Sequence, residues 1–222
     1  MSIGKMTKDE FINIIREGSV DKKHQVIQDA DPTFFDDTLF NILVSQLENA
    51  DYRVRFSALY YLIDKFSKEL SEPTDELANL MVKLLKDKAI VIDRAAWALS
   101  IMGEIGLNKL FKNAHTKDSK LRRNVIWAIG RNTNLNLKKE KAIQILMEGI
   151  QDKNEEIRFT SMCSLIDISP LRNDDYYMIK GYDFTEVYKK MKATAKYFME
   201  SDNESHRDFG KRYFIWIEEE KK

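Results

Sequence analysis

The sequence predicts an all-α fold in which about six antiparallel helix pairs stack into a right-handed superhelix, an α-solenoid. The first observation is a short phrase that recurs at the start of helical runs: an aspartate, an apolar anchor and, in most copies, an arginine. Its copies are Asp51–Arg55, Asp87–Asp93, Asp118–Arg122 and Asp152–Arg158, with a degraded copy at Asn203–Arg207. The second observation is that 222 residues include only 3 prolines and 8 glycines, which favours long helices over tight β-turns. A repeated supersecondary unit decides the architecture of a chain, so the phrase is the strongest indication of the fold.

Apolar residues at helical spacing predict the elements in chain order, and no run has the period-two spacing of a strand. Residues 1–31 form an N-terminal capping pair, whose second helix follows the capping residue Ser19. The next four pairs have first helices near 35–48, 77–85, 107–114 and 142–150, and second helices near 51–68, 90–103, 118–131 and 155–168. An inter-repeat loop at 170–183 precedes a C-terminal capping pair at 184–222, so we expect a single domain over 1–222.

The repeat spacing and one repeat's sequence resemble a known class. The anchors Val54, Ile92, Leu121, Ile157 and His206 are separated by 38, 29, 36 and 49 residues, and the signatures of tetratricopeptide and ankyrin units are missing. The run Asp93-Arg-Ala-Ala-Trp-Ala-Leu-Ser-Ile-Met-Gly-Glu-Ile-Gly106 resembles the short HEAT-like repeats first named from phycobilin lyases. The resemblance covers residues 33–168 well and the two ends weakly. It implies a HEAT-like, armadillo-like solenoid, a fold that serves scaffolds, adaptors and a few enzymes.

The aspartates and arginines of the phrase are expected to have structural roles. An aspartate before a helix caps its free amides and suits its positive dipole end. The next repeat lies beside the arginine that follows each anchor, so this arginine can meet a neighbouring aspartate. We therefore predict an inter-repeat ladder that includes Arg55, Asp93, Arg122 and Arg158, with a rung Arg55–Asp93–Arg122. The alternative is that some of these arginines recognise a ligand.

The second helices are expected to line the concave face, where two positions of each helix point into a groove. At 100° per residue these are the second and sixth positions after each anchor. They hold Phe56 and Tyr60, Arg94 and Ala98, Arg123 and Trp127, Phe159 and Cys163, and Asp208 and Arg212. Aromatic rings interleaved with arginines are typical of binding surfaces, so the predicted partner-binding residues are Phe56, Tyr60, Arg94, Arg123, Trp127, Phe159 and Arg212. The alternative is that superhelical curvature or a terminal helix buries these rings as core.

The charge and composition of the chain do not favour a particular class of partner. The chain has 36 basic and 36 acidic side chains, so its net charge does not favour nucleic acid or membranes. Residues 107–131 are locally basic and suit an acidic peptide or a phosphate backbone, although most basic runs are simply solvated. Cys163 is the only cysteine, the first ten residues are polar, and no stretch of 18 apolar residues occurs, which together predict a cytoplasmic protein.

The sequence predicts no catalytic residues, no metal site and no cofactor. The histidines, His24, His115 and His206, have no partner at metal-ligand spacing, and no glycine-rich phosphate loop occurs. Cys163 lies on a helix without a histidine nearby in sequence, which favours packing over nucleophilic chemistry. The pairs Asp36-Asp37 and Asp174-Asp175 offer carboxylates for acid–base chemistry, but exposed carboxylates at helix starts and in loops are common.

One enzyme class remains as an alternative. The run from Asp118 to Ile129 resembles a helix of the HEAT-like alkylpurine DNA glycosylases, in which indole rings and a carboxylate flank a damaged nucleotide. Trp97, Trp127, Arg122, Arg123 and Asp93 echo that chemistry, but the Asn-Trp-Asp-type motif is missing. The preferred hypothesis is a non-catalytic adaptor or scaffold that binds an acidic or aromatic-containing segment of a protein partner in its concave groove. The partner's identity and the oligomeric state stay open.

Overall fold

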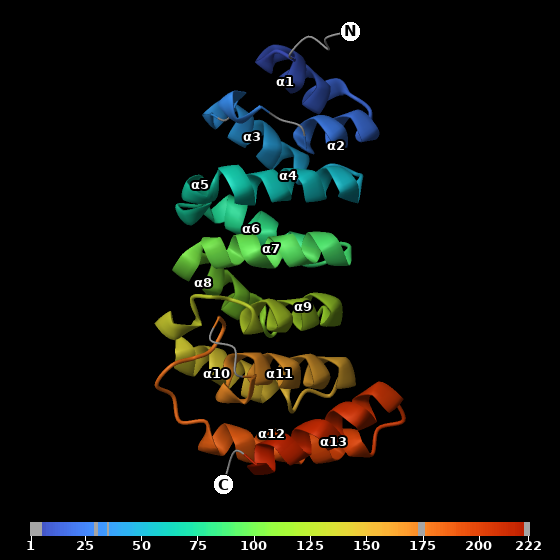
Figure 1. The fold of residues 1–222 in the computed structure, drawn as a ribbon, viewed down its shortest axis with the longest axis vertical. Coiled ribbons are helices and arrows are strands. Elements are labelled where there is room, and N and C mark those ends of the chain that lie inside the picture. The colour runs from blue at the N-terminus through green and yellow to red at the C-terminus, as the bar shows by residue number, and fades with distance from the viewer. Residues whose placement is uncertain (1–5, 29–30, 35, 173–175, 220–222) are drawn as a thin grey trace. The chain divides into compact units, whose positions relative to one another are not determined.

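The computed structural model describes residues 6–28, 31–34, 36–172 and 176–219. Over these residues the chain forms thirteen α-helices and three short 3-10 helices, with no β-strand (Figure 1). The all-α fold predicted from the repeats is therefore confirmed. The chain divides into two compact units, residues 1–106 and 107–222. The helix α8 (Gly103–Asn113) contains the boundary.

The first unit consists of helices packed as successive pairs. Their bounds are α1 Lys8–Glu17, α2 Val20–Gln28, α3 Asp37–Gln46, α4 Tyr52–Lys65, the short α5 Ser67–Ser71, α6 Asp75–Leu84 and α7 Ala89–Ile101. The helix α1 packs on α2, α3 on α4, and α6 on α7. The second helices of the pairs also pack on each other, because α4 contacts both α2 and α7 (Figure 1). This inner row places the α4 and α7 side chains that are discussed below next to each other.

The second unit repeats the arrangement. Its helices after α8 are α9 Ser119–Gly130, α10 Lys139–Gly149, α11 Glu155–Ile168, α12 Thr185–Met199 and α13 Glu204–Glu219. The helix α10 pairs with α11, and α12 pairs with α13. The second helices α9 and α11 pack on each other, as α4 and α7 do in the first unit.

Polar caps explain where the second helices begin. The carboxylate of Asp51 accepts a hydrogen bond from the amide of Arg53, and the carboxylate of Asp118 accepts one from the amide of Leu121. In α11 the cap is Asn154, not the aspartate of the phrase. Such side chains satisfy the amides that have no partner in the first turn of a helix, which fixes the residue at which the helix starts.

The repeat register in α7 differs by one residue from the prediction. Val91 is fully buried, as Val54 is in α4, whereas Ile92 is only half-buried. Val91 is therefore the anchor of this repeat. The sequence was ambiguous because Ala95 and Ala96 are both small and either can follow an anchor by four residues. The sixth position after the anchor, which is the predicted surface position, is therefore Trp97 instead of Ala98. Trp97 is exposed and Ala98 is buried.

The arginines of the phrase connect neighbouring repeats, but through other aspartates than expected. Arg55 pairs with Asp87 rather than with Asp93, with Nε 2.5 Å from Oδ2. Arg122 pairs in the same way with Asp152, with Nε 3.1 Å from Oδ2. Asp93 is exposed. The register explains the difference, because Asp87 and Asp152 lie just before their helices, where the preceding repeat's arginine reaches them.

Each of these arginines also bonds to its own repeat. An Nη1 group donates to the backbone carbonyl six residues earlier: Arg55 to Asn49, Arg122 to Thr116, Arg158 to Asp152 and Arg207 to Ser201. Arg158 reaches the following repeat through Tyr197, whose hydroxyl oxygen accepts a hydrogen bond of 2.5 Å from Nη2. The guanidinium carbon also lies 4.4 Å from the centroid of that ring. Each arginine therefore holds the turn of its own repeat, and Arg55, Arg122 and Arg158 also contact the following repeat.

The insertion between α11 and α12 is attached to the second unit on both sides of its undescribed part. Residues 173–175, which include the predicted carboxylate pair Asp174-Asp175, lie outside the described residues. Before them, the side chain of Leu171 is buried. After them, the buried Ile179 donates its amide to the carbonyl of Ile168 at 2.9 Å. Asn136 accepts a 2.9 Å hydrogen bond from the amide of Lys180, which holds the end of the insertion against the segment before α10.

Candidate functional site

Two exposed aromatic side chains lie on either side of Arg94 on the surface of α4 and α7. Tyr60 is 44% exposed and Trp97 is 49% exposed. Arg94 lies between them, with its guanidinium carbon 5.6 Å from the centroid of the tyrosine ring and 5.5 Å from that of the indole. Both distances are within the range of cation–π attraction. We call Tyr60, Arg94 and Trp97 the Arg94 stack.

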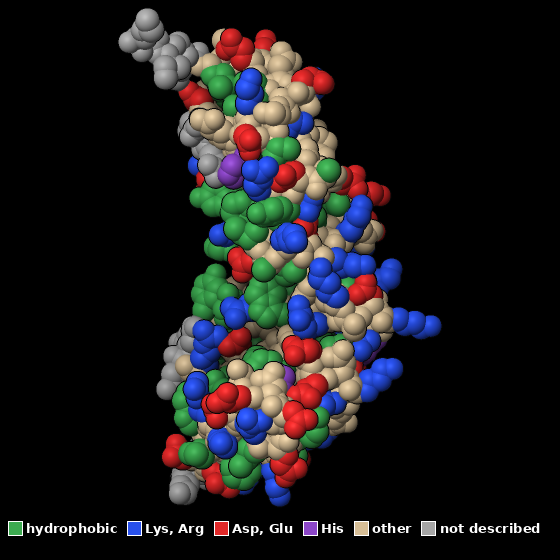
Figure 2. Space-filling view, turned by 90° about the vertical axis from the view of Figure 1, so that its right-hand side faces the viewer, with side chains coloured by type: hydrophobic (Ala, Val, Ile, Leu, Met, Phe, Trp, Pro, Cys, Tyr) green, Lys and Arg blue, Asp and Glu red, His purple; other side chains and the backbone are tan. Residues whose placement is uncertain are grey.

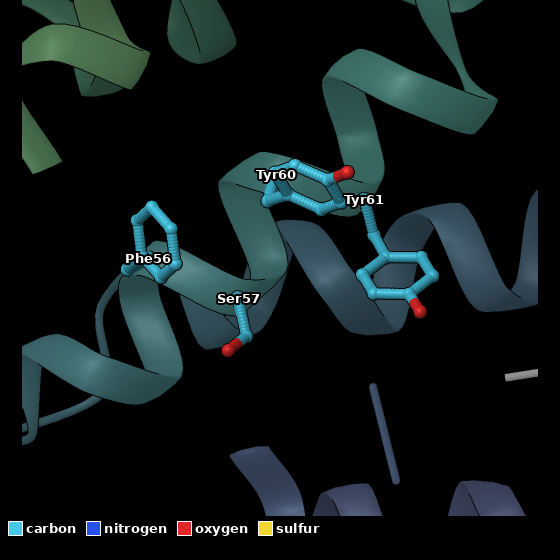
Figure 3. A pocket seen from close by; sticks show the side chains of 4 residues that line it. All are labelled: Phe56, Ser57, Tyr60 and Tyr61. Carbon is cyan, nitrogen blue, oxygen red and sulfur yellow. The ribbon is translucent and has the colours of Figure 1, made fainter. Parts of the chain in front are cut away.

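A pocket adjoins the Arg94 stack on α4. It has a volume of about 300 Å³ and is lined by Phe56, Ser57, Tyr60 and Tyr61. Figure 3 shows the rings of Phe56 and Tyr60 on one side of the helix, and the side chains of Ser57 and Tyr61 directed to another. The rings of Phe56 and Tyr60 have centroids 6.3 Å apart, as expected for side chains four residues apart on a helix. Tyr60 belongs to both the pocket and the stack, so the two features share a wall.

A hydrogen bond holds one wall of the pocket in place. Nδ1 of His24, on α2, lies 2.5 Å from the hydroxyl oxygen of Ser57. Ser57 is almost fully buried, whereas His24 is half-buried. Tyr61 is also nearly buried, and its ring centroid lies 5.8 Å from that of Tyr60. The pocket is therefore lined by two buried side chains, Ser57 and Tyr61, by the half-buried Phe56 and by the exposed Tyr60.

The charge of Arg94 distinguishes it from its neighbours. Arg53 forms ion pairs with Asp21 and Asp51, and Arg55 forms one with Asp87. Arg94 makes no hydrogen bond or ion pair with any side chain that the structure describes, and its Nε is buried without an acceptor. Figure 2 shows hydrophobic side chains gathered at the level of α4 and α7, with lysine and arginine side chains among them. Among the residues that the structure describes, Arg94 is therefore an arginine whose charged group contacts ring faces instead of a carboxylate.

In the second unit, the predicted residues on α9 have different surroundings. Trp127 is half-buried, and the guanidinium carbon of Arg131 lies 5.0 Å from the centroid of its ring. That arginine also has a carboxylate partner, with Nη2 3.8 Å from Oδ2 of Asp167. Arg123 donates to the side-chain oxygen of Asn124 at 3.3 Å and lines a polar pocket of about 350 Å³.

The rings on α11 are packed against other rings. Phe159 stacks on His206 with centroids 4.3 Å apart, and it contacts Phe198 at 5.7 Å and Phe209 at 4.7 Å. It is half-buried, so part of its surface is used within the second unit. Arg212, on α13, is exposed.

The structure thus brings together three of the predicted partner-binding residues, Phe56, Tyr60 and Arg94, within the first unit. Sequence reasoning omitted Trp97 from this group because its repeat was aligned on Ile92 instead of Val91. The missing signal was available in the pattern Ala58-x-x-Tyr61-Leu62, which matches Ala95-x-x-Ala98-Leu99 and places Trp97 in the slot of Tyr60.

The side chains that could act as a nucleophile or bind a metal ion give no sign of either role. Burial raises the pKa of the Cys163 thiol to about 12, and the nearby carboxylate of Asp167 adds to the shift. A thiol with so high a pKa carries little of the reactive thiolate at neutral pH. Within the described part of the chain, no group of three histidine, cysteine, aspartate or glutamate side chains is arranged to hold a metal ion.

Every helix of the described residues is too short or too polar to span a lipid bilayer.

Comparisons with known proteins give the fold. No protein-family model matches the chain, and no curated protein matches its sequence. The structure of Cex1p is similar with a TM-score of 0.59 and 14% identity, over 96% of this chain and 44% of that one. A crescerin structure, described as a TOG domain array that regulates microtubules in the primary cilium, has a TM-score of 0.55 and 12% identity over 93% and 88% of the two chains. The chain therefore has the fold of HEAT-like repeat proteins.

Proposed function

We propose that this chain is a non-catalytic protein-binding module, and that a segment of its partner lies against the exposed rings of Tyr60 and Trp97. The observation that carries the proposal is the exposure of these two rings, 44% and 49%, on one surface around Arg94. Tyrosine, tryptophan and arginine are the residues most enriched among those that dominate binding energy in protein interfaces. A surface with this composition stabilises a complex by covering ring area that water otherwise contacts.

The fold supports a protein partner rather than a small substrate. Stacked helix pairs present a long row of side chains from successive repeats, and each repeat contributes to one extended surface. Crescerin, a protein of similar fold, is described as regulating microtubules through its TOG domain array. The likeness is of fold only, so the partner of this chain has to be sought from its own surface.

The experiment compares variants of the full chain in quantitative affinity purification. Tyr60→Ala and Trp97→Ala remove the two rings, and Trp216→Ala is the matched control, because Trp216 is a 42% exposed tryptophan on α13 in the other unit. We expect at least one co-purifying protein to be lost with both ring variants and kept with the control. Reconstitution with that protein should give about tenfold weaker binding for each ring variant.

Two outcomes would overturn the proposal. One is that both ring variants retain every partner of the wild type, with unchanged affinity. The other is tight binding of mixed-sequence duplex DNA that weakens steeply between low and moderate salt, which would favour a nucleic-acid-binding protein instead. Thermal unfolding of each variant checks that the loss of binding does not come from loss of the fold.

A further inference from the structure

We infer that the partner segment recognised by the first unit carries a carboxylate side chain within two residues of a large apolar side chain. The carboxylate would pair with Arg94, and the apolar side chain would enter the pocket formed by Phe56, Ser57, Tyr60 and Tyr61. This inference rests on the proposed function, because it names the chemistry of the segment that the protein-binding surface takes.

The first step is the charge of Arg94. The two arginines on α4 each have aspartate partners, whereas Arg94 has none among the described side chains. A guanidinium is always charged in a protein, and its planar fork of donors matches a carboxylate in two parallel hydrogen bonds. The guanidinium of Arg94 therefore has N–H donors that no described side chain of the protein uses. A basic side chain at this position of the partner is disfavoured, because it would meet the charge of Arg94 with like charge.

The second step is the position of the guanidinium. Its carbon lies within 5.6 Å of the Tyr60 ring and within 5.5 Å of the Trp97 ring, so the two rings limit the positions it can adopt. Holding the side chain in one place lowers the entropy that is lost when a ligand binds. The rings also exclude water from part of the guanidinium, which strengthens an ion pair formed there relative to one in open solvent. Arg94 is therefore preorganised for an anion.

The third step is the adjoining pocket. Its volume of about 300 Å³ and its three aromatic walls suit one large apolar side chain. Tyr60 lines the pocket and also contacts Arg94, so the two subsites are separated by the width of one ring. Consecutive residues of an extended chain are about 3.3–3.6 Å apart, so an acidic residue and an apolar residue must be immediate or near neighbours to fill both subsites.

The test uses peptides selected without assumption about their sequence. A phage-displayed library of random dodecapeptides is panned on the full-length protein, with the Tyr60→Ala variant as a counter-selection. We expect enrichment of peptides in which aspartate or glutamate lies within two residues of phenylalanine, leucine or isoleucine. One selected peptide is then synthesised in an acidic form and in a form with the carboxylate replaced by its amide.

The affinities of the two peptides separate the carboxylate contact from general binding. We expect Arg94→Met to weaken binding of the acidic peptide about tenfold and to leave the amide peptide's affinity unchanged. Arg94→Lys should recover part of the loss because it keeps the charge without the fork. Arg131→Met, which removes a half-buried arginine lying over the Trp127 ring of the other unit, is the control and should change neither affinity.

The outcomes distinguish this inference from the proposed function. If the selected peptides need Tyr60 and Trp97 but contain no acidic residue, or if Arg94→Met affects both peptide forms equally, the inference is wrong and the protein-binding surface stands. If the counter-selection on Tyr60→Ala leaves no enriched peptide, the inference fails together with the assignment of this surface. Equal unfolding temperatures for the wild type and Arg94→Met keep a folding defect from imitating either result.

Discussion

Arg55 and Asp87 form a two-point ion pair between consecutive repeats of the first unit. Nε lies 2.5 Å from Oδ2, and Nη2 lies 2.6 Å from Oδ1. The side chains are only 16% and 10% exposed. The same carboxylate accepts a 2.7 Å hydrogen bond from the amide of Lys88, next to the start of α7. This pair therefore links the position of one helix to the start of the next.

We expect Arg55→Met to destabilise the protein by about 2 kcal/mol, because it leaves a largely buried carboxylate without its cation. Chemical denaturation measures the effect, and the matched control is Lys83→Met. Lys83 pairs with Glu48 at 2.9 Å, but the two side chains are 71% and 62% exposed. Loss of this exposed pair should change the free energy of unfolding by no more than about 0.5 kcal/mol. Similar values for the two variants would show that the Arg55 pair is not structurally important.

We expect Gly106→Ala to destabilise the first unit far more than Gly103→Ala. A methyl group on Gly106 would lie 1.9 Å from the carbonyl oxygen of Leu99, so backbone has to move, at a cost of about 3 kcal/mol. Gly103 has a φ of 59° but open space around its Cβ position, so only the left-handed conformation is penalised, by about 1 kcal/mol. Midpoints of urea unfolding report both values, and the reverse order would contradict this account of the α7–α8 turn.

We expect part of the stability of the second unit to be lost in acid through Glu155. Hydrogen bonds from His206 and Ser201 lower the pKa of this carboxyl from its ordinary value of 4.5. A carboxyl whose pKa is lower in the folded state stabilises the protein above the unfolded pKa, and this contribution is lost as the pH falls through the folded value. Glu155→Gln should therefore unfold with a weaker dependence on pH below about 5 than the wild type. Glu140→Gln, which changes an exposed carboxylate on α10 of the same unit, is the control and should keep the wild-type slope.

We expect Cys163 to react slowly with iodoacetamide in the folded protein. Burial raises its pKa to about 12, so the thiolate that attacks the reagent is scarce. In urea the thiol returns to an ordinary pKa, and alkylation at mildly alkaline pH should become at least about a hundredfold faster. Mass spectrometry of the single cysteine measures both rates. Equal rates in the two states would show that the thiol is accessible in the fold.

The pairing of helices and most of their limits could be predicted from the sequence because they depend on local patterns. Apolar residues three and four positions apart give the buried face of each helix, and Asp51 and Asp118 provide caps where α4 and α9 begin. The short helix α5 was absorbed into the preceding prediction, since Lys65 and Ser67 continue its polar pattern without a glycine or proline between them.

The site was less accessible to sequence reasoning because it depends on register. An error of one residue rotates a helix by about 100°, which moves a side chain from the surface to the core. In α7 this error placed buried Ala98 where the structure has the exposed Trp97. The ladder was missed for a related reason. Asp93 lies on α7 and is covered by a helical projection, whereas Asp87 lies in the turn before α7, which the projection does not place.

By itself the sequence determined that this protein is a stack of helix pairs, because helical periodicity and caps act over a few residues. Only the tertiary structure decided that Arg55 joins Asp87, that Phe159 packs on His206, and that Arg94 lies between Tyr60 and Trp97. These relationships join residues that are far apart in the chain, or depend on which face each helix turns toward its neighbour. Packing between helices sets that rotation, and a pattern within one helix does not contain it.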